Sequence, residues 1–479
     1  MISARLLTFS AVVAASALIL WLVCARAALP QASAQGKLLE VRDSPSAPAL
    51  AGSNSCAAAG CHGALRPQTD ELVQHNELTV WVGEDKHALA YDALFSATAV
   101  KMVKLLGDKV PAHEDIRCLA CHVNPLTATT SPSTRERAEW ISGTGCEACH
   151  GSASRWLREH TQPAWQSLRS AEKSKAGMTP PGETAAFARQ CAGCHVGAPE
   201  QGGMPLREVN HDLIAAGHPR LHFEFGVYLA NLPRHWSKRI NEKLPPDYPL
   251  RAWYAGQLVS AQAAAELLAD RAQHAGKAQN GRPWPEFTEY NCYACHHDLS
   301  QPSDRQKPQH LAGRTPGSLP WGSWNFSMPG VLAESDESAK MKLLPILQQL
   351  RKLMQERSSD FRPISTQASA AANALGIWLD QSQQKIDSTA LARQLRASAV
   401  QGQSFLEDWD HAEQLYLGLA ALQQWKRDRS AGRTLEALAR KLAFDAAPDK
   451  DQYESPRDFD RNRSALRQQF QELGKYLAQ

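Results

Sequence analysis

The sequence predicts a mainly α-helical protein with little regular sheet, made of two unlike parts. Apolar residues recur at the three- and four-residue spacing of amphipathic helices, and no segment alternates apolar and polar residues as a half-buried strand would. Ten of the eleven cysteines lie between residues 56 and 295, whereas the chain beyond residue 334 has none and is rich in Leu, Ala and Gln. With 479 residues, of which 43% are hydrophobic, the chain is long enough for two or more domains.

The N-terminus has the features of a secretory signal peptide. Arg5 precedes an apolar run over residues 6–23, and small-residue cleavage sites follow at residues 25–27 and 32–34. We therefore expect residues 1–34 to be a signal peptide that directs export to the periplasm, with cleavage after Ala34. The apolar run is also just long enough to span a bilayer, so an uncleaved N-terminal anchor is the alternative. Residues 35–55 are small and polar and are predicted to form a flexible lead-in.

All ten remaining cysteines occur in pairs, and a histidine follows the second cysteine of every pair. Four pairs have the pattern Cys-x-x-Cys-His, and the pair nearest the N-terminus has four residues between its cysteines. The spacing between motifs is uneven, so the chain is not a simple repeat. In chain order the motif residues are Cys56, Cys61 and His62; Cys118, Cys121 and His122; Cys146, Cys149 and His150; Cys191, Cys194 and His195; and Cys292, Cys295 and His296.

The pattern Cys-x-x-Cys-His is the attachment signature of c-type haem. Two thiols bond to the vinyl groups at one edge of the porphyrin, and the adjacent histidine then binds the iron from one side. Structural zinc would need two cysteine pairs per ion, and a disulfide framework would not place a histidine after every pair. Redox Cys-x-x-Cys sites would need a thioredoxin-like βαβ pattern around them. We therefore predict five covalently bound haem c groups, of which the one at Cys56 and Cys61 has the least usual spacing.

Twelve further histidines are available to bind the opposite side of each iron. His87 belongs to an apolar pattern at helical spacing, and His160 follows ten residues after His150. His211 and His218 are seven residues apart, which would place both on one face of a helix. We predict that these four, His87, His160, His211 and His218, are distal ligands.

The other histidines are weaker candidates, because a lone histidine is more often a structural or surface residue than a ligand. His222 remains a weak ligand candidate, and His297 could reach a neighbouring haem but not the iron held by His296. The remaining ones are expected to be surface, hydrogen-bonding or structural residues: His75, His113, His235, His274, His310 and His411.

The chain is predicted to consist of a haem-bearing domain over residues 56–298, a Pro/Gly-rich linker over 299–334 and a helical domain over 335–479. In the first domain the haem groups would form much of the core, because each porphyrin offers a large apolar face to bury. The last domain is expected to be a small helical bundle. Helices are predicted over residues 253–274, from Pro345, over 370–380, and from Ser404, where Ser404 and Glu407 would form a capping box.

Net charge and hydropathy exclude some classes of protein. The formal charge is +3 and no Lys/Arg stripe dominates any region, so nucleic-acid binding is not expected. The N-terminal apolar run is the only one of membrane-spanning length, which excludes a multispan protein. Loss of residues 1–34 would remove Arg5 and Arg26 and so lower the formal net charge by two. Five haem groups, each with a charge of roughly −1, would then make the net charge of the holoprotein negative.

Several segments resemble the cytochrome c-554-like family of multihaem c-type cytochromes. The likeness covers roughly residues 50–325, and its distinctive parts are Cys146 to Gly151 with Trp156 and His160, Cys194 to Gly197, Val209 to Leu221, and Cys295 to Leu299. The resemblance implies a mainly α multihaem cytochrome c fold, closely paired haem groups, bis-histidine ligation and electron transfer. It also implies distal roles for the four predicted ligands. Five motifs rather than four and the added C-terminal helical domain depart from the family pattern, so the pairing of ligands stays open.

We therefore expect a periplasmic protein that relays electrons between redox partner proteins, whose identity the sequence does not specify. A membrane-associated redox complex and a homo-oligomer are both compatible with this function. The alternative is a multihaem reductase or oxidase of small nitrogen or sulfur compounds, which requires one iron with an open position. A Cys-x-x-Cys-Lys motif, which would mark one such active haem, is absent from the sequence.

Overall fold

The computed structural model is almost entirely helical, which confirms the predicted mainly α fold. The structure describes residues 50–68, 73–180, 182–275, 277, 282–292, 295–296, 314–356, 360–382, 385–401, 408–442 and 457–477. Among these residues, extended pairing is confined to isolated bridges such as that between Ala198 and Arg207. The predicted signal peptide, the lead-in up to residue 49, the capping box at Ser404 and Glu407, His297 and His310 lie outside the described residues.

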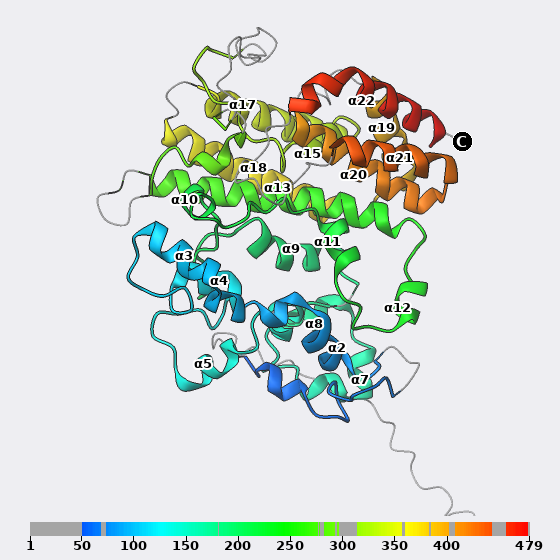
Figure 1. Cartoon of the computed structure of the whole chain (residues 1–479). Helices are drawn as coiled ribbons and strands as arrows, with labels where there is room; N and C mark the ends of the chain where they lie inside the picture. The colour runs from blue at the N-terminus through cyan, green and yellow to red at the C-terminus, as the bar shows by residue number, and fades with distance from the viewer. Residues whose placement is uncertain are drawn as a thin grey trace, which may run out of the picture.

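Short helices and turns make up the N-terminal part, shown at the bottom of Figure 1. Side-chain caps define several of them: the Asp115 carboxylate accepts from the Arg117 N–H at the start of one helix, and Ser133 forms a capping box with Glu136 at another. The helices are α2 Glu77–Glu84, α3 Ala97–Leu106, α4 Ile116–His122, α5 Thr134–Trp140, α6 Cys146–His150, α7 Pro163–Gln166, α8 Ser170–Lys175, α9 Thr184–His195, α10 His211–Ala215, α11 Phe225–Asn231 and α12 Lys238–Glu242. Single 3-10 turns are η1 Ser53–Cys56, η2 Lys86–Leu89, η3 Asp92–Phe95, η4 Glu159–Thr161 and η5 Phe287–Glu289.

A long helix, α13 (Tyr248–His274), crosses the middle of the molecule and is buried along most of its length. It packs against α9 and α11 on one side and against the C-terminal helices α18 and α20 on the other. Small residues allow this close packing: a Cβ at Gly256 would lie 2.6 Å from the Phe225 Cβ. A helix that is apolar on all sides belongs in a core, and α13 is that central element.

The C-terminal helices form a layer above α13 in Figure 1. They are α15 Ser327–Ala333, α16 Glu337–Lys342, α17 Leu344–Met354, α18 Phe361–Ser382, α19 Ser388–Gln401, α20 Trp409–Lys426, α21 Arg429–Leu442 and α22 Arg457–Tyr476. The helix predicted from Ser404 begins instead at Trp409, because the Asp408 side chain accepts from the His411 N–H and caps it there.

One continuous hydrophobic core joins the two parts of the chain. It extends from Ala185 in α9 through α13 to Leu477 beyond α22, and it includes the buried Trp321 of the predicted linker. Smaller separate cores lie around Trp140 and Trp156 in the N-terminal part. In the described part of the chain, no helix is both long and apolar enough to cross a membrane.

Candidate haem sites

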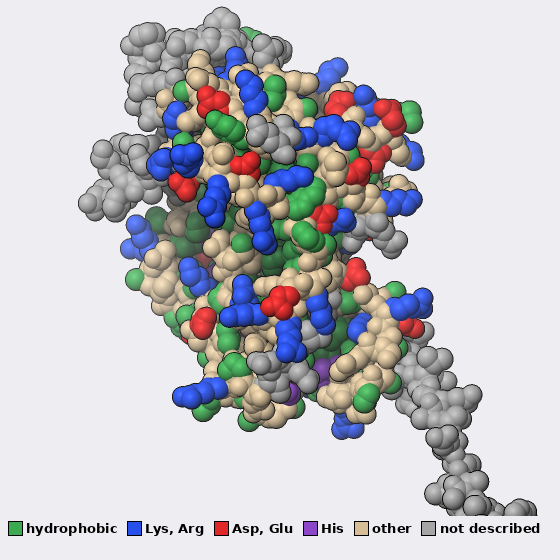
Figure 2. All heavy atoms as spheres, turned by 90° about the vertical axis from the view of Figure 1, so that its right-hand side faces the viewer, with side chains coloured by type: hydrophobic (Ala, Val, Ile, Leu, Met, Phe, Trp, Pro, Cys, Tyr) green, Lys and Arg blue, Asp and Glu red, His purple; other side chains and the backbone are tan. Residues whose placement is uncertain are grey.

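We name the five motifs sites A to E in chain order, from Cys56 at site A to Cys292 at site E. Sites A to D surround one cavity of about 2500 Å³. Figure 2 shows the hollow, with apolar side chains deep inside it and histidine near its lower end. All four motif histidines of these sites line the cavity, as do four other histidines: His87, His160, His218 and His235. Site E and His211 lie outside the cavity lining.

Helical geometry brings the residues of each motif together. At sites B, C and D the motif forms the end of a helix, so that α4, α6 and α9 each stop at the motif histidine. Cysteines three positions apart then lie on one side of the helix. At site E the His296 N–H donates to the Cys292 carbonyl at 2.8 Å, which makes a similar helical turn.

At site A a wider loop brings the motif residues together. The His62 N–H donates to the Cys56 carbonyl at 3.2 Å, across five intervening residues. Gly63 follows, and a Cβ there would lie 1.9 Å from the Ala57 carbonyl oxygen, so this turn requires glycine.

Four of the five motif histidines face a second histidine at nearly the same distance. The ring centroids are 6.2 Å apart for His62 and His160, 6.0 Å for His195 and His87, 6.2 Å for His150 and His235, and 6.3 Å for His296 and His211. With metal–nitrogen bonds of about 2.0–2.1 Å, two imidazoles on opposite sides of one metal ion have centroids roughly 6.3 Å apart. The four pairs therefore match the geometry of bis-histidine coordination.

The fifth motif histidine, His122 at site B, is influenced by His218. Burial and the charge of His218 lower the pKa of His122, against a hydrogen bond to the Ala90 carbonyl that raises it. Burial also lowers the pKa of His150 and of His195 to about 4, with charge from His235 and His87 adding to the effect. These imidazoles are neutral at pH 7, which is the form that binds a metal ion.

Hydrogen bonds at Nδ1 orient six of the ten paired histidines and leave Nε2 free. His62 donates to Glu77 at 3.1 Å and His87 to Asp85 at 2.8 Å, so these two have carboxylate partners. The others donate to backbone carbonyls: His122 to Ala90, His160 to Trp156, His218 to Pro219 and His235 to Pro233. Such partners fix the ring orientation of metal-binding histidines in proteins.

The attachment cysteines of different sites lie close together. The thiols of Cys56 at site A and Cys146 at site C lie close enough to shift each other's pKa, and so do those of Cys121 at site B and Cys194 at site D. Burial raises the pKa of Cys149 to about 12, and its neighbours Cys191 and Cys194 at site D add to the shift. Sites A and C, C and D, and D and B are therefore direct neighbours.

Two ligand expectations change in the structure. His211 and His218 do not share a helix face, because α10 ends at Ala215 and Gly217 adopts a positive φ of 118°. They point to different sites, E and B. His235, expected on the surface, is half-buried and faces His150.

Among the other histidines that the structure describes, none pairs with a motif histidine at this distance. His222 packs against Trp324 and Trp409, and burial lowers its pKa to about 3. His113 stacks on Phe95. Hydrogen bonds link His75 to the Cys61 carbonyl, His274 to Asp270 and His411 to Asp408.

The residues around the cavity suit haem. A small-molecule site usually has roughly 300–1,000 Å³, so the cavity has room for several large groups. Its lining is mainly apolar and includes paired imidazoles and cysteine thiols. The ten cysteines of the described residues are free, so disulfides do not compete for them.

Comparison with known proteins agrees with this chemistry. Residues 56–151 match the family model described as cytochrome c554 and c-prime. No curated protein and no solved structure matches the chain. The matched segment contains sites A to C, and proteins of this kind hold haem c through cysteine thioethers and transfer electrons. Over residues 56–151 the chain is therefore similar to c-type cytochromes of the cytochrome c554 and c-prime family, whose haem c is covalently bound.

Proposed function

We propose that the chain binds five haem c groups, one at each of sites A to E, and relays electrons between redox partner proteins in the periplasm. One observation supports this most directly: four of the five motif histidines have a second histidine at 6.0–6.3 Å between ring centroids. Two histidine ligands favour low-spin iron that transfers electrons without binding substrate.

The proposed ligand pairs follow from these contacts. They are His62 with His160 at site A, His122 with His218 at site B, His150 with His235 at site C, His195 with His87 at site D, and His296 with His211 at site E. Burial lowers the pKa of His122, His150 and His195, and hydrogen bonds at Nδ1 orient six of the ten imidazoles.

The contacts between cysteines support an order of sites A–C–D–B–E. Cys56 meets Cys146, Cys149 lies beside Cys191, and Cys194 meets Cys121. Site E joins the series at site B, because one short segment carries both His211 and His218. Bound haem supplies reversible one-electron chemistry, and the role of the chain is to fix the spacing and environment of each site.

The alternative function, reduction or oxidation of small nitrogen or sulfur compounds, requires an iron with an open position. The second histidine beside four of the five motif histidines argues against it. Site A, with its wider cysteine spacing, has a well-placed partner in His160, whose ring is within 13° of parallel to that of His62.

The proposal is tested on the full chain, expressed with its leader in a host that attaches haem c. We expect an intact mass with five haem additions, recovery from the periplasmic fraction and an EPR spectrum with low-spin iron only. Fewer than five haem groups would refute the stoichiometry, and a stoichiometric high-spin signal that responds to nitrite or hydroxylamine would support the enzyme instead. Recovery in the membrane fraction would show an uncleaved N-terminal anchor.

A pair of variants controls for site A. Cys56→Ser with Cys61→Ser should remove one haem and leave four. Cys24→Ser, which changes the cysteine outside the motifs, should leave all five.

A further inference from the structure

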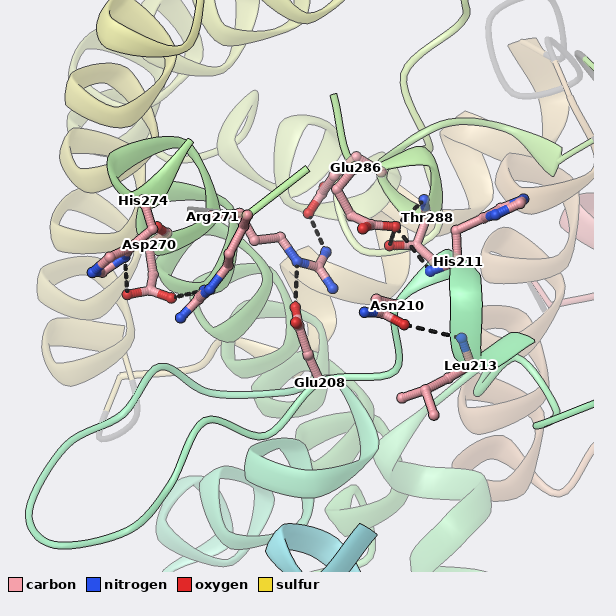
Figure 3. A network of polar contacts seen from close by, with 11 residues as sticks. Glu208, Asn210, His211, Leu213, Asp270, Arg271, His274, Glu286 and Thr288 are labelled. Atoms are coloured by element: carbon pink, nitrogen blue, oxygen red, sulfur yellow. Dashed lines mark hydrogen bonds and ion pairs between the residues drawn. The ribbon is translucent and has the colours of Figure 1, made fainter. Parts of the chain in front are cut away.

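A buried arginine on α13 connects the two segments that form site E. The Arg271 side chain is 6% exposed; its Nε donates to Glu208 at 2.8 Å and its Nη1 to Glu289 at 2.6 Å. Figure 3 shows Arg271 reaching from α13 toward these loops, with Glu208 on one side. Both acceptors come from chain segments distant from each other in sequence.

Each of the two glutamates lies three residues before a residue of site E. Glu208 precedes His211, and Glu289 precedes Cys292. Between Glu208 and His211, the Asn210 side chain caps α10 by accepting a hydrogen bond from the Leu213 N–H at 3.0 Å. The Arg271 side chain therefore contacts, from a third element, both the segment of the distal histidine and the segment of the attachment motif.

A third carboxylate, that of Glu286, also connects the two segments of site E. Glu286 accepts from the His211 N–H at 2.9 Å, and from the N–H and hydroxyl of Thr288 at 3.1 Å (Figure 3). Glu286 thus ties the first residue of α10 directly to the segment that leads to Cys292. This contact sets the position of the His211 backbone relative to the motif.

Because these contacts are buried, the charge of Arg271 is needed to compensate the glutamate carboxylates. Burial raises the pKa of Glu289, while the Arg271 charge lowers it, so the guanidinium is what offsets the cost of a buried carboxylate here. Removal of one member of a buried ion pair leaves the other uncompensated and is strongly destabilising. Without Arg271, we expect Glu208 and Glu289 to move toward water and to carry their segments with them.

Site E is set apart from the other sites and is partly exposed. Its residues lie outside the cavity that sites A to D share, and Cys295 and His296 are exposed. The spacing of its two imidazoles, 6.3 Å between centroids, must therefore be set by the loops that carry them.

We propose that Arg271 is a positioning residue for site E, which holds His211 opposite His296 through Glu208 and Glu289. This inference rests on the proposed function, because it assumes that a haem iron is bound between these histidines. It predicts that loss of Arg271 changes the coordination at one site and leaves the other four unaltered.

The experiment first establishes the wild-type holoprotein by intact mass, EPR and potentiometric titration. A Cys292→Ser, Cys295→Ser variant identifies the signal and the midpoint potential of site E by their loss. If the wild type lacks a low-spin haem at site E, the proposed function fails there before Arg271 is tested.

Arg271→Met is then compared with Arg271→Lys and with Arg251→Gln. Arg251 is a matched control because it lies on the same helix and forms an ion pair of 2.8 Å with Asp247. Neither residue belongs to the segments of site E. We expect Arg271→Met to convert the site E signal, one fifth of the iron, to high-spin or to shift its potential, Arg271→Lys to restore it in part, and Arg251→Gln to match the wild type.

An unchanged site E signal in folded Arg271→Met would overturn the inference, as would an equal change at all five sites. If Arg271→Met does not accumulate, Glu208→Gln is used in its place. This variant keeps the ion pair between Arg271 and Glu289 and weakens only the contact between Arg271 and the segment that carries His211. A change confined to site E supports the inference, and a wild-type spectrum and titration refute it.

Discussion

Replacement of Glu77 by Gln should raise the midpoint potential of the haem at site A. The Glu77 carboxylate accepts from His62 Nδ1 at 3.1 Å, and both side chains are largely shielded from solvent. Burial raises the pKa of Glu77, but the hydrogen bonds from His62 and from backbone N–H groups outweigh it and lower the pKa. The group is therefore a carboxylate at neutral pH, and its negative charge stabilises the ferric state over the ferrous state.

The size of the effect follows from the geometry. The imidazole ring and a metal–nitrogen bond of about 2 Å place the iron roughly 6–7 Å from the Glu77 oxygen. At an effective dielectric constant near 20, a unit charge at that distance contributes about 2.5 kcal/mol. One-electron potentials change by about 59 mV for each 1.4 kcal/mol, so the expected rise is at most roughly 100 mV. Glutamine keeps an oxygen to accept the hydrogen bond, so the ring should stay in place.

The assay is a potentiometric titration of the purified holoprotein, with site A assigned through the variant that lacks Cys56 and Cys61. Glu84→Gln is the matched control, because Glu84 lies on the same helix and is exposed. One potential should rise in Glu77→Gln and none in Glu84→Gln. Five unchanged potentials, or a fall at site A, would refute the reasoning.

Three further changes have expected outcomes. His235→Ala should make one fifth of the haem iron high-spin by EPR, and a fully low-spin spectrum would exclude His235 as a ligand. Gly418→Ala should lower the free energy of unfolding by about 1–3 kcal/mol in a urea titration, since the new Cβ would lie 2.8 Å from the Trp253 ring; wild-type stability would contradict this packing. Burial, aided by Asp410, raises the pKa of Glu413 from 4.5 to about 7, so the native state holds this proton longer than the unfolded state and stability should fall as pH rises between these values. Glu413→Gln should remove that loss and unfold at higher urea than the wild type at pH 8 but not at pH 4, and equal differences at both pH values would contradict it.

The attachment motifs could be predicted from the sequence because their chemistry is local. Two cysteines and a histidine close together in sequence define the motif wherever the segment is placed, and α4, α6 and α9 each end at the motif histidine. The helices over 253–274 and from Pro345 were predictable for the same reason, since their apolar spacing is an intrinsic property of the segment.

The distal ligands depend on long-range packing, and here the sequence was less informative. His235 lies between Arg234 and Trp236 in a loop without helical periodicity, so no local signal distinguishes it from a surface histidine. Only the fold brings it to His150, 85 residues earlier in the chain. His211 and His218 show the opposite problem: their spacing suggests one helix, but Gly217 breaks the helix and directs them to different sites.

The C-terminal helices give the haem-bearing part a rigid support. The helix that ends in the site D motif, α9, packs on α13, and Arg271 of α13 holds the loops of site E. On its other side α13 packs against α18 and α20, and Gln257 donates a buried hydrogen bond to Gln414 at 2.8 Å. Electron transfer between fixed sites requires little reorganisation of the protein, so a shared core beneath sites D and E serves that function. We infer that the added helices stabilise sites D and E, which the family segment over residues 56–151 does not include.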